Sequence, residues 1–152
     1  MSSYRATVDW RWDGGDFGKH RYSREHSVDF GGLVVRGSAS PHIVPAPFSR
    51  ADALDPEAGF TASLSACHML WFLDLAARAG FTVESYRDEA EGTLAKGDAG
   101  KLVMTKVVLR PQVAWAGERR PTAAEVEALH HKAHEECFLA NSVKTEVVVE
   151  VA

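Results

Sequence analysis

The chain has 152 residues, of which 45% are hydrophobic, and it carries a formal net charge of -4 with a pI near 6.0. This length and apolar content predict one compact domain over residues 1–152. The acidic balance and the lack of a basic face weigh against nucleic-acid binding. The N-terminus has no apolar signal core, and the longest nearly uncharged run, residues 58–73, is short for a membrane span. We therefore expect a cytoplasmic protein that does not bind nucleic acid or membranes.

The first part of the chain is predicted to be rich in strands. Alternating residues over Tyr4–Trp12 predict a first strand, and Asp13-Gly14-Gly15 predicts the turn that ends it. A hairpin is predicted over Ser27–Ser38, with its turn at Gly31-Gly32. The prolines of Pro41–Leu54 predict a long ordered loop. A loop of this length in a small domain is often functional.

The central element is predicted to be one long helix over Asp55–Gly80. Asp55 is a suitable N-cap, Pro56 suits the first helical position, and Gly80 supplies the left-handed stop. Apolar residues cover almost every direction around this helix, so we expect it to be enclosed by the rest of the protein. Cys67 lies near its middle.

After this helix, Phe81–Leu94 reads as a solvent-facing strand, and Lys96–Gly100 as a turn. The β-branched residues of Leu102–Val113 predict a return strand, so that the two form an antiparallel hairpin. Pro111 near the end of the return strand indicates an edge or a bulge, because proline cannot donate a ladder hydrogen bond.

A second helix is predicted to open at Thr122, where Thr122 and Glu125 form a capping box. Helical spacing places Cys137 on its apolar face. Alternation over Val143–Val151 predicts a half-exposed closing strand. The element order is hairpin, buried helix, hairpin, amphipathic helix and strand, which is an α+β layout.

The two cysteines are the main candidates for chemistry. A cysteine within an apolar helix most often packs as a small hydrophobic residue. The second cysteine, on the apolar face of the other helix, favours a functional role for the two thiols as a pair. A buried thiol is inert unless a cation beside it stabilises the thiolate. That cation must come from another segment, and the candidates are Arg21, Arg24, Arg36 and Arg50, each of which is more often a solvated surface residue.

Glu57 and His68 lie on the same predicted helix as Cys67. Glu57 precedes Cys67 by ten residues, or roughly 15 Å along a straight helix. The two can share a site only if the helix bends near Gly59 or if a second subunit supplies one of them. His68 projects about 100° away from Cys67, so it is not a natural base for that thiol.

The run HHKAHEEC offers a competing interpretation. His130, His134 and Cys137 fall near one face of the second helix and could ligate zinc. No strong fourth ligand is nearby, and histidines at a helix end are more often plain surface or interface residues.

The segment DPEAGFTASLSACHMLWF resembles the Asn-Pro-Glu…Ala-Cys-Phe helix of the OsmC-like family, which includes osmotically inducible protein C and the organic hydroperoxide resistance proteins. The resemblance continues through the AGF turn, the hairpin around DAGKLVMTKVVL, and AHEECFLANSVKTEVVVEV. It covers most of the chain from Asp55 onward and implies one OsmC-like α+β domain that forms an intertwined homodimer.

The resemblance also implies a thiol peroxidase that reduces organic hydroperoxides without a cofactor or metal. By position, Cys67 matches the peroxidatic cysteine, Cys137 the resolving cysteine and Glu57 the family's acid. The family arginine aligns with Arg24, with Arg21 as the alternative.

The resemblance further implies a dithiol or a lipoylated protein as the reductant. An apolar substrate pocket could be formed by Trp10, Trp12, Phe30 and Phe138. Two alternatives remain open: a non-catalytic small-molecule or metal-binding protein of this fold that uses His130, His134 and Cys137, and a structural dimer with inert thiols.

Overall fold

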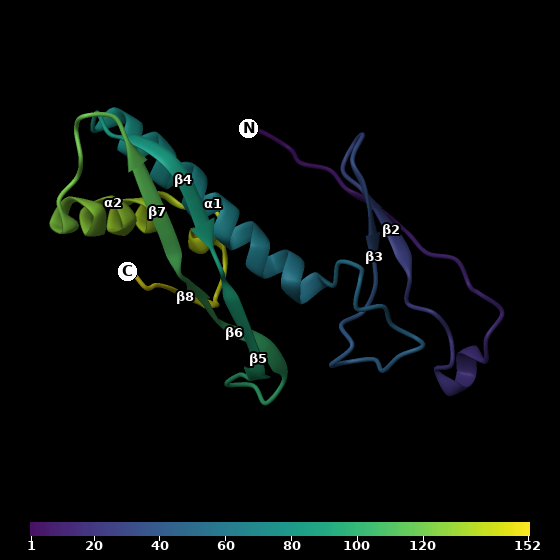
Figure 1. Ribbon diagram of the computed structural model, residues 1–152. Coiled ribbons are helices and arrows are strands. Elements are labelled where there is room, and N and C mark those ends of the chain that lie inside the picture. The colour runs from purple at the N-terminus through teal and green to yellow at the C-terminus, as the bar shows by residue number, and fades with distance from the viewer. The chain divides into compact units, whose positions relative to one another are not determined.

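The computed structural model describes residues 1–152, and the chain divides into two compact units, residues 1–59 and residues 60–152. Figure 1 shows the strands and helices of both. The first unit contains a three-stranded sheet, and the second contains the remaining strands and the second helix. That one domain spans residues 1–152 stays a prediction.

The first unit is an antiparallel sheet in the order β1 (Thr7–Asp9), β2 (His26–Asp29) and β3 (Val34–Gly37). β1 is shorter than predicted, because only its three residues find partners on the short strand β2. The predicted hairpin between β2 and β3 is confirmed, and its turn is closed by the hydrogen bond from Phe30 N to Leu33 O at 2.9 Å. The 3₁₀ helix η1 (Phe17–Lys19) lies in the connection from β1 to β2.

The long loop before the central helix is confirmed, since residues 41–54 form no helix or strand. Its end is tied to β3 by two backbone hydrogen bonds, from Leu54 N to Arg36 O at 2.9 Å and from Ser38 N to Leu54 O at 3.0 Å. These bonds fix where the chain leaves the sheet and enters the helix.

The central helix α1 runs over Pro56–Arg78. Its predicted ends are confirmed: the Asp55 carboxylate accepts from Ala58 N at 2.8 Å, and Gly80 has a φ of 82°. The expectation that α1 is enclosed is wrong, because one stripe alone is buried and Leu70 is 62% exposed. The buried stripe is formed by Thr61, Leu64, His68, Phe72 and Ala76. By length and composition α1 could cross a membrane, a test that the core helix of a water-soluble protein also passes.

The hairpin after α1 is confirmed, but each of its two long arms is broken in the middle. The first arm is β4 (Thr82–Asp88) and β5 (Glu91–Lys96), rather than one strand. The second arm is β6 (Leu102–Leu109) and β7 (Pro111–Ala116). β5 pairs with β6 and β4 pairs with β7, both antiparallel.

The carboxylate of Asp88 lies at this break, where it accepts from Arg110 N at 2.6 Å and from the Ser65 hydroxyl on α1. Pro111 begins β7 opposite Asp88, so the proline marks the interruption of the second arm.

The second helix α2 (Ala123–Glu136) has the predicted capping box. Thr122 Oγ accepts from Glu125 N at 3.2 Å, and the Glu125 carboxylate accepts from Thr122 N at 3.2 Å. The 3₁₀ helix η2 (Ala140–Ser142) follows, and the closing strand β8 (Glu146–Val149) pairs in parallel with β6. The predicted α+β fold class is confirmed.

The second unit has two apolar clusters on the buried stripe of α1. One gathers Phe72, Ala76, Phe81 and Ala133, so it joins α1 to α2, and the other gathers Leu64, Val107 and Leu109, so it joins α1 to β6. A fully buried Leu or Phe contributes about 2 kcal/mol to folding. The two clusters pack α1 against α2 and β6, and they thereby position the part of α1 that carries Cys67.

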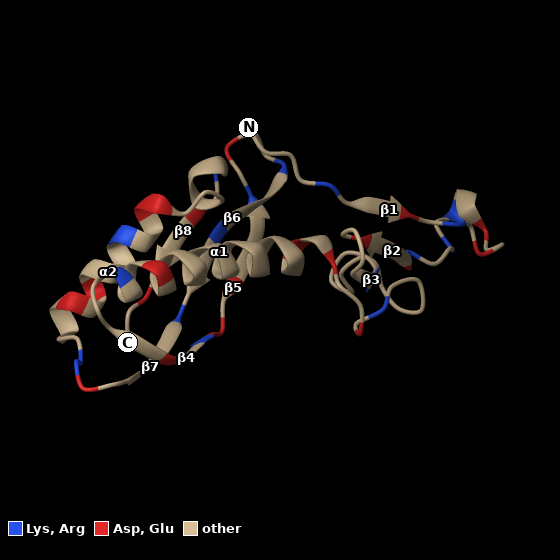
Figure 2. Cartoon of the chain, turned by 90° about the horizontal axis from the view of Figure 1, so that it is seen from above, with Lys and Arg blue, Asp and Glu red and all other residues tan.

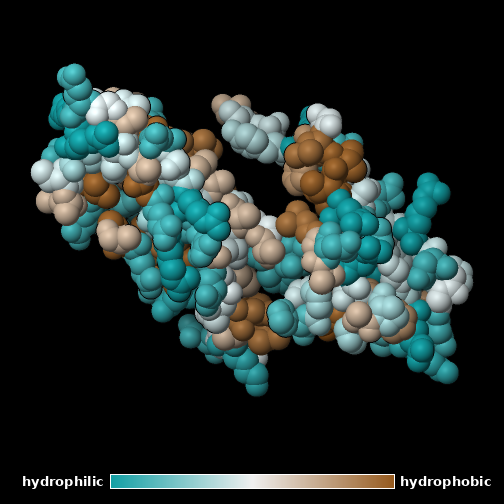
Figure 3. All heavy atoms as spheres, viewed as in Figure 1, coloured by the Kyte–Doolittle hydropathy of each residue, from teal (hydrophilic) through white to brown (hydrophobic).

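Apolar residues also reach the surface. Figure 3 shows brown apolar patches among the teal polar residues. Figure 2 shows charged residues along α2. Glu125, Glu127, Lys132 and Glu135 on this helix are exposed, as expected for an amphipathic helix.

Candidate functional site

The two cysteines come together in the second unit. Cys67 lies midway along α1 and is half-buried, whereas Cys137 is the C-cap of α2 and is only 1% exposed. Their side chains form a hydrogen bond with each other, and both thiols are free. Because the two thiols lie within reach of each other, a disulfide between them would require only a local movement.

The surroundings of Cys137 favour its protonated form. Burial, followed by the hydrogen bond with Cys67, raises the pKa of the Cys137 thiol to about 11, against a smaller opposing effect of backbone N–H groups. One of these groups, Ala140 N, donates to Cys137 Sγ at 3.4 Å. At neutral pH the Cys137 thiol therefore keeps its proton, and its S–H can donate a hydrogen bond to the Cys67 sulfur.

An aromatic pair connects the same two segments. Trp71, one helical turn after Cys67, meets Phe138, which follows Cys137, with ring centroids 5.4 Å apart at an angle of 78°. Phe138 is 69% exposed, so its ring offers apolar surface next to Cys137 in the sequence. The other rings predicted to form a substrate pocket, those of Trp10, Trp12 and Phe30, belong to the first unit.

Two buried histidines pair between α1 and α2. His68 Nε2 lies 3.0 Å from His130 Nδ1, the two side chains are 1% and 2% exposed, and His130 stacks on Phe72 with centroids 4.1 Å apart. Burial lowers the pKa of each imidazole to about 4. His68 thus packs away from the thiols, as its position on the helix predicted.

The predicted alternative of a metal site formed by His130, His134 and Cys137 is wrong for this structure. No group of three or more histidine, cysteine, aspartate or glutamate side chains is arranged to hold a metal ion. The hydrogen bonds explain why: His130 is paired with His68, and Cys137 with Cys67 and Ala140 N.

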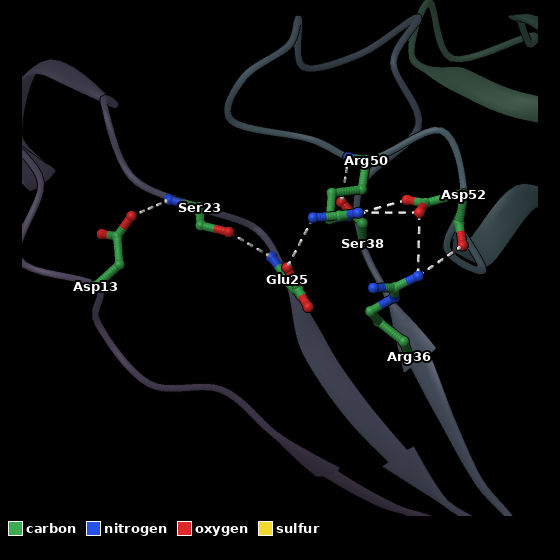
Figure 4. A network of polar contacts seen from close by, with 7 residues as sticks. All are labelled: Asp13, Ser23, Glu25, Arg36, Ser38, Arg50 and Asp52. Carbon is green, nitrogen blue, oxygen red and sulfur yellow. Dashed lines mark hydrogen bonds and ion pairs between the residues drawn. The ribbon is translucent and has the colours of Figure 1, made fainter.

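The candidate arginines Arg36 and Arg50 are engaged in a polar network of the first unit (Figure 4). Arg50 donates twice to the Asp52 carboxylate at 2.9 Å and also pairs with Glu25. Arg36 donates to the same Asp52 carboxylate at 3.1 Å. Hydrogen bonding to Arg50 lowers the pKa of Asp52 to about 2. Both guanidinium groups are thus compensated by carboxylates.

Arg24, also in the first unit, has neutral hydrogen-bond partners and a weak electrostatic interaction with the Asp13 carboxylate. Its Nη1 donates to the carbonyls of His20 and Tyr22, and its guanidinium lies over the Tyr22 ring. The alternative, Arg21, is exposed and lies 5.7 Å from the ring centroid of Phe48. Glu57 lies in the first turn of α1. The catalytic roles of Arg24, Arg21 and Glu57 stay predictions.

Sequence reasoning missed the His68–His130 pair and the hydrogen bond from Ser65 to Asp88. A signal for the first was present, because His68 falls between Leu64 and Phe72 on the helical spacing of the buried stripe. No local pattern indicates the second, which joins residues of two different elements.

Several solved structures are similar to this chain. An OsmC-like protein of unknown function from Vibrio cholerae is 50% identical, with a TM-score of 0.97 over 100% of both chains. An organic hydroperoxide resistance protein from Elizabethkingia anophelis, with thiocyanate bound, is 19% identical, with a TM-score of 0.71 over 99% of this chain and 94% of that one. The organic hydroperoxide resistance protein OhrB of Bacillus subtilis is 19% identical, with a TM-score of 0.69 over 98% of each chain. The last two show a shared fold.

No curated protein shows significant similarity to the chain. The sequence profile of the family described as OsmC-like protein matches residues 49–152, a range that includes Glu57, Cys67 and Cys137. The match covers more than half of the chain and agrees with the 50% identity to the Vibrio cholerae protein. The chain therefore belongs to the OsmC-like protein family.

Proposed function

We propose that this protein is a cysteine-based peroxidase that reduces organic hydroperoxides. The observation that carries the proposal is the hydrogen bond between Cys67 and Cys137, two thiols brought together from the middle of α1 and the end of α2. Membership of the OsmC-like family supports it, as do the names of structural relatives that are organic hydroperoxide resistance proteins.

The first step of the proposed cycle is attack by Cys67. Its thiolate attacks the terminal oxygen of the hydroperoxide, so that an S–O bond forms and the O–O bond breaks. Cys67 becomes a sulfenic acid, and the displaced alkoxide takes up a proton to become the alcohol. Cys67 is the better nucleophile of the pair, because it is half-buried, whereas Cys137 is enclosed and its pKa is raised.

The second step resolves the sulfenic acid. The Cys137 sulfur attacks the Cys67 sulfur, a disulfide forms, and the oxygen leaves as water. A dithiol or a lipoylated protein then supplies two electrons and two protons to restore both thiols. This cycle starts from free thiols, which suits a reducing compartment such as the cytoplasm.

Arg24 and Glu57 complete the proposed site. Arg24 would place its positive charge at the thiolate and at the leaving oxygen, and Glu57 would orient the guanidinium. Arg24 suits the role better than Arg36 or Arg50, because the positive charges of the latter two are compensated by Asp52.

A homodimer is part of the proposal. α1 has one buried stripe, and an apolar residue such as Leu70 is 62% exposed. A second copy of the chain that covered this surface would stabilise it by roughly 25 cal/mol per Å² of apolar area. It would also allow Glu57 and Cys67, which lie about 15 Å apart along one helix, to meet from different subunits.

The test is to treat the reduced protein with cumene hydroperoxide and to follow both peroxide consumption and free thiols. The wild type should lose both thiols and form an intramolecular disulfide. Cys67→Ser should consume no peroxide. The matched variant Cys137→Ser should consume one equivalent and stop at a sulfenic acid that dimedone traps.

Retention of both thiols by the wild type in excess peroxide would exclude the proposed cycle. Equal peroxide consumption by Cys67→Ser and the wild type would exclude Cys67 as the attacking residue. Parallel assays with hydrogen peroxide would test the preference for organic substrates, which should react faster.

A further inference from the structure

The groups that hold the guanidinium of Arg24 by hydrogen bonds and ring contact are neutral, and the Asp13 carboxylate interacts with it only weakly. The central carbon of the guanidinium lies 3.6 Å from the ring centroid of Tyr22, and Nη1 donates to the carbonyl of His20 at 3.1 Å and to that of Tyr22. The ion pairs within residues 1–59 are made by Lys19, Arg36 and Arg50, not by Arg24. A guanidinium that forms no ion pair keeps most of its positive charge available for an anion.

The ring beneath this guanidinium is itself fixed by two other aromatic side chains. Phe17 stacks on Tyr22 with centroids 4.5 Å apart and an angle of 18°, and Trp10 meets Tyr22 edge-on at 5.7 Å and 70°. Trp10 Nε1 donates to Ser23 O at 2.9 Å, which anchors the indole to the chain beside Tyr22. The Tyr22 ring is therefore a rigid surface for the guanidinium.

The backbone around Arg24 is fixed as well. Arg24 N donates to Phe48 O at 2.9 Å, which joins the segment before β2 to the long loop. His20 adopts a left-handed conformation with a φ of 61°, which ends η1 and presents its carbonyl to Arg24. The backbone of Arg24 and the guanidinium at the tip of its side chain are thus both held by hydrogen bonds.

We infer that Tyr22 is a positioning residue of the peroxidase reaction, acting by holding the guanidinium of Arg24 on its ring. An arginine side chain has many rotamers, and a cation–π contact removes most of them before the substrate arrives. A charge that is already in place stabilises a thiolate and a leaving alkoxide more than a mobile one does. The inference rests on the proposed function and on the assignment of Arg24 as its cationic residue.

The experiment compares Tyr22→Leu, which removes the aromatic face but keeps an apolar side chain, with Tyr22→Phe, which keeps the face. Two quantities are measured: kcat/KM for cumene hydroperoxide, and the pH dependence of Cys67 alkylation by iodoacetamide in a Cys137→Ser background. Phe48→Leu is the matched control, because it removes the ring beside Arg21 instead. Circular dichroism and the chromatographic size of each variant test whether it folds.

Tyr22→Leu should lower kcat/KM by about 5- to 30-fold and shift Cys67 alkylation to higher pH, as expected for loss of one cation–π contact. Tyr22→Phe and Phe48→Leu should stay within about 2-fold of the wild type, because both leave an aromatic face under Arg24. Tyr22→Leu should have no further effect when Arg24 is already alanine.

Equal activity of Tyr22→Leu and Tyr22→Phe would overturn the inference, as would additive effects of Tyr22→Leu and Arg24→Ala. An inactive Arg24→Ala variant beside a fully active Tyr22→Leu variant would overturn the role of Tyr22 but leave the proposed function intact. A fully active Arg24→Ala variant would overturn both the role of Tyr22 and the assignment of Arg24. Failure of the proposed function itself is separate, because the wild type would then keep both thiols.

Discussion

Acidification from pH 7 to pH 5 should destabilise this protein through the buried pair of His68 and His130. Each imidazole is at most 2% exposed, and burial lowers its pKa from 6.5 to about 4. The groups that face the pair are His134 on α2, which lowers the pKa of His68 further, and Asp88 on β4, which opposes the shift by a smaller amount. Both histidines are therefore neutral in the folded protein at neutral pH.

The sign of the effect follows from these values. The unfolded chain takes up protons as the pH falls through 6.5, whereas the folded protein takes them up only near pH 4. The stability that the two neutral histidines contribute is fully present above pH 6.5. It is lost progressively as the pH falls from 6.5 to about 4. At pH 5 the loss is about 2 kcal/mol for one imidazole and about 4 kcal/mol for the pair. This is a large part of the roughly 5–15 kcal/mol that stabilises a typical domain.

The assay is urea unfolding at one protein concentration and at pH 7, 6 and 5, followed by tryptophan fluorescence. The double variant His68→Leu/His130→Leu replaces both partners by apolar groups, so its stability should fall much less over this range. The control variant His42→Gln removes an exposed histidine and should behave as the wild type does. A wild type and a double variant that lose the same free energy between pH 7 and pH 5 would refute the reasoning.

Two further predictions concern the architecture. Asp88→Ala should lower the free energy of unfolding by about 2–4 kcal/mol, because it leaves Arg110 N and the Ser65 hydroxyl without their acceptor. Asp88→Asn keeps an acceptor oxygen, so urea unfolding should show a smaller loss; a larger loss for asparagine than for alanine would contradict the hydrogen-bond argument. Thr122→Ala should cost about 1 kcal/mol by removing the capping box, whereas Thr122→Ser should cost little. Thermal unfolding by circular dichroism should show a Tm lowered by about 2–4 °C for alanine, and an unchanged Tm would contradict the role of the cap.

The features that the sequence predicted well are local ones. The caps at Asp55 and Thr122, the stop at Gly80 and the turn at Gly31-Gly32 depend on side chains and backbone angles within a few residues, and all are present. The order of elements and the α+β class followed from these signals. The profile match and the structural relatives confirmed the resemblance to the OsmC-like family.

The features that sequence reasoning missed or mispredicted depend on contacts between distant segments. Each arm of the second hairpin breaks where Asp88 accepts hydrogen bonds from Ser65 and Arg110. Pro111 indicated an irregularity in the second arm, but no pattern within the arms reveals these partners of Asp88. The prediction that α1 is enclosed was wrong, because the apolar content of a helix shows how much surface it can bury. It does not show which sides of the helix have another element packed against them. The metal interpretation failed because His130 pairs with His68, 62 residues away in the chain.

For the candidate site, the sequence alone placed one cysteine within the first helix and the other at the second, and it predicted that a cation would come from another segment. The tertiary structure decided that the thiols form a hydrogen bond, and it decided which guanidinium groups are already neutralised. Residue type and spacing set what a side chain can do within its own element. Only the packing of one element on another sets which groups it meets, and those neighbours control the charge and the reactivity of a thiol.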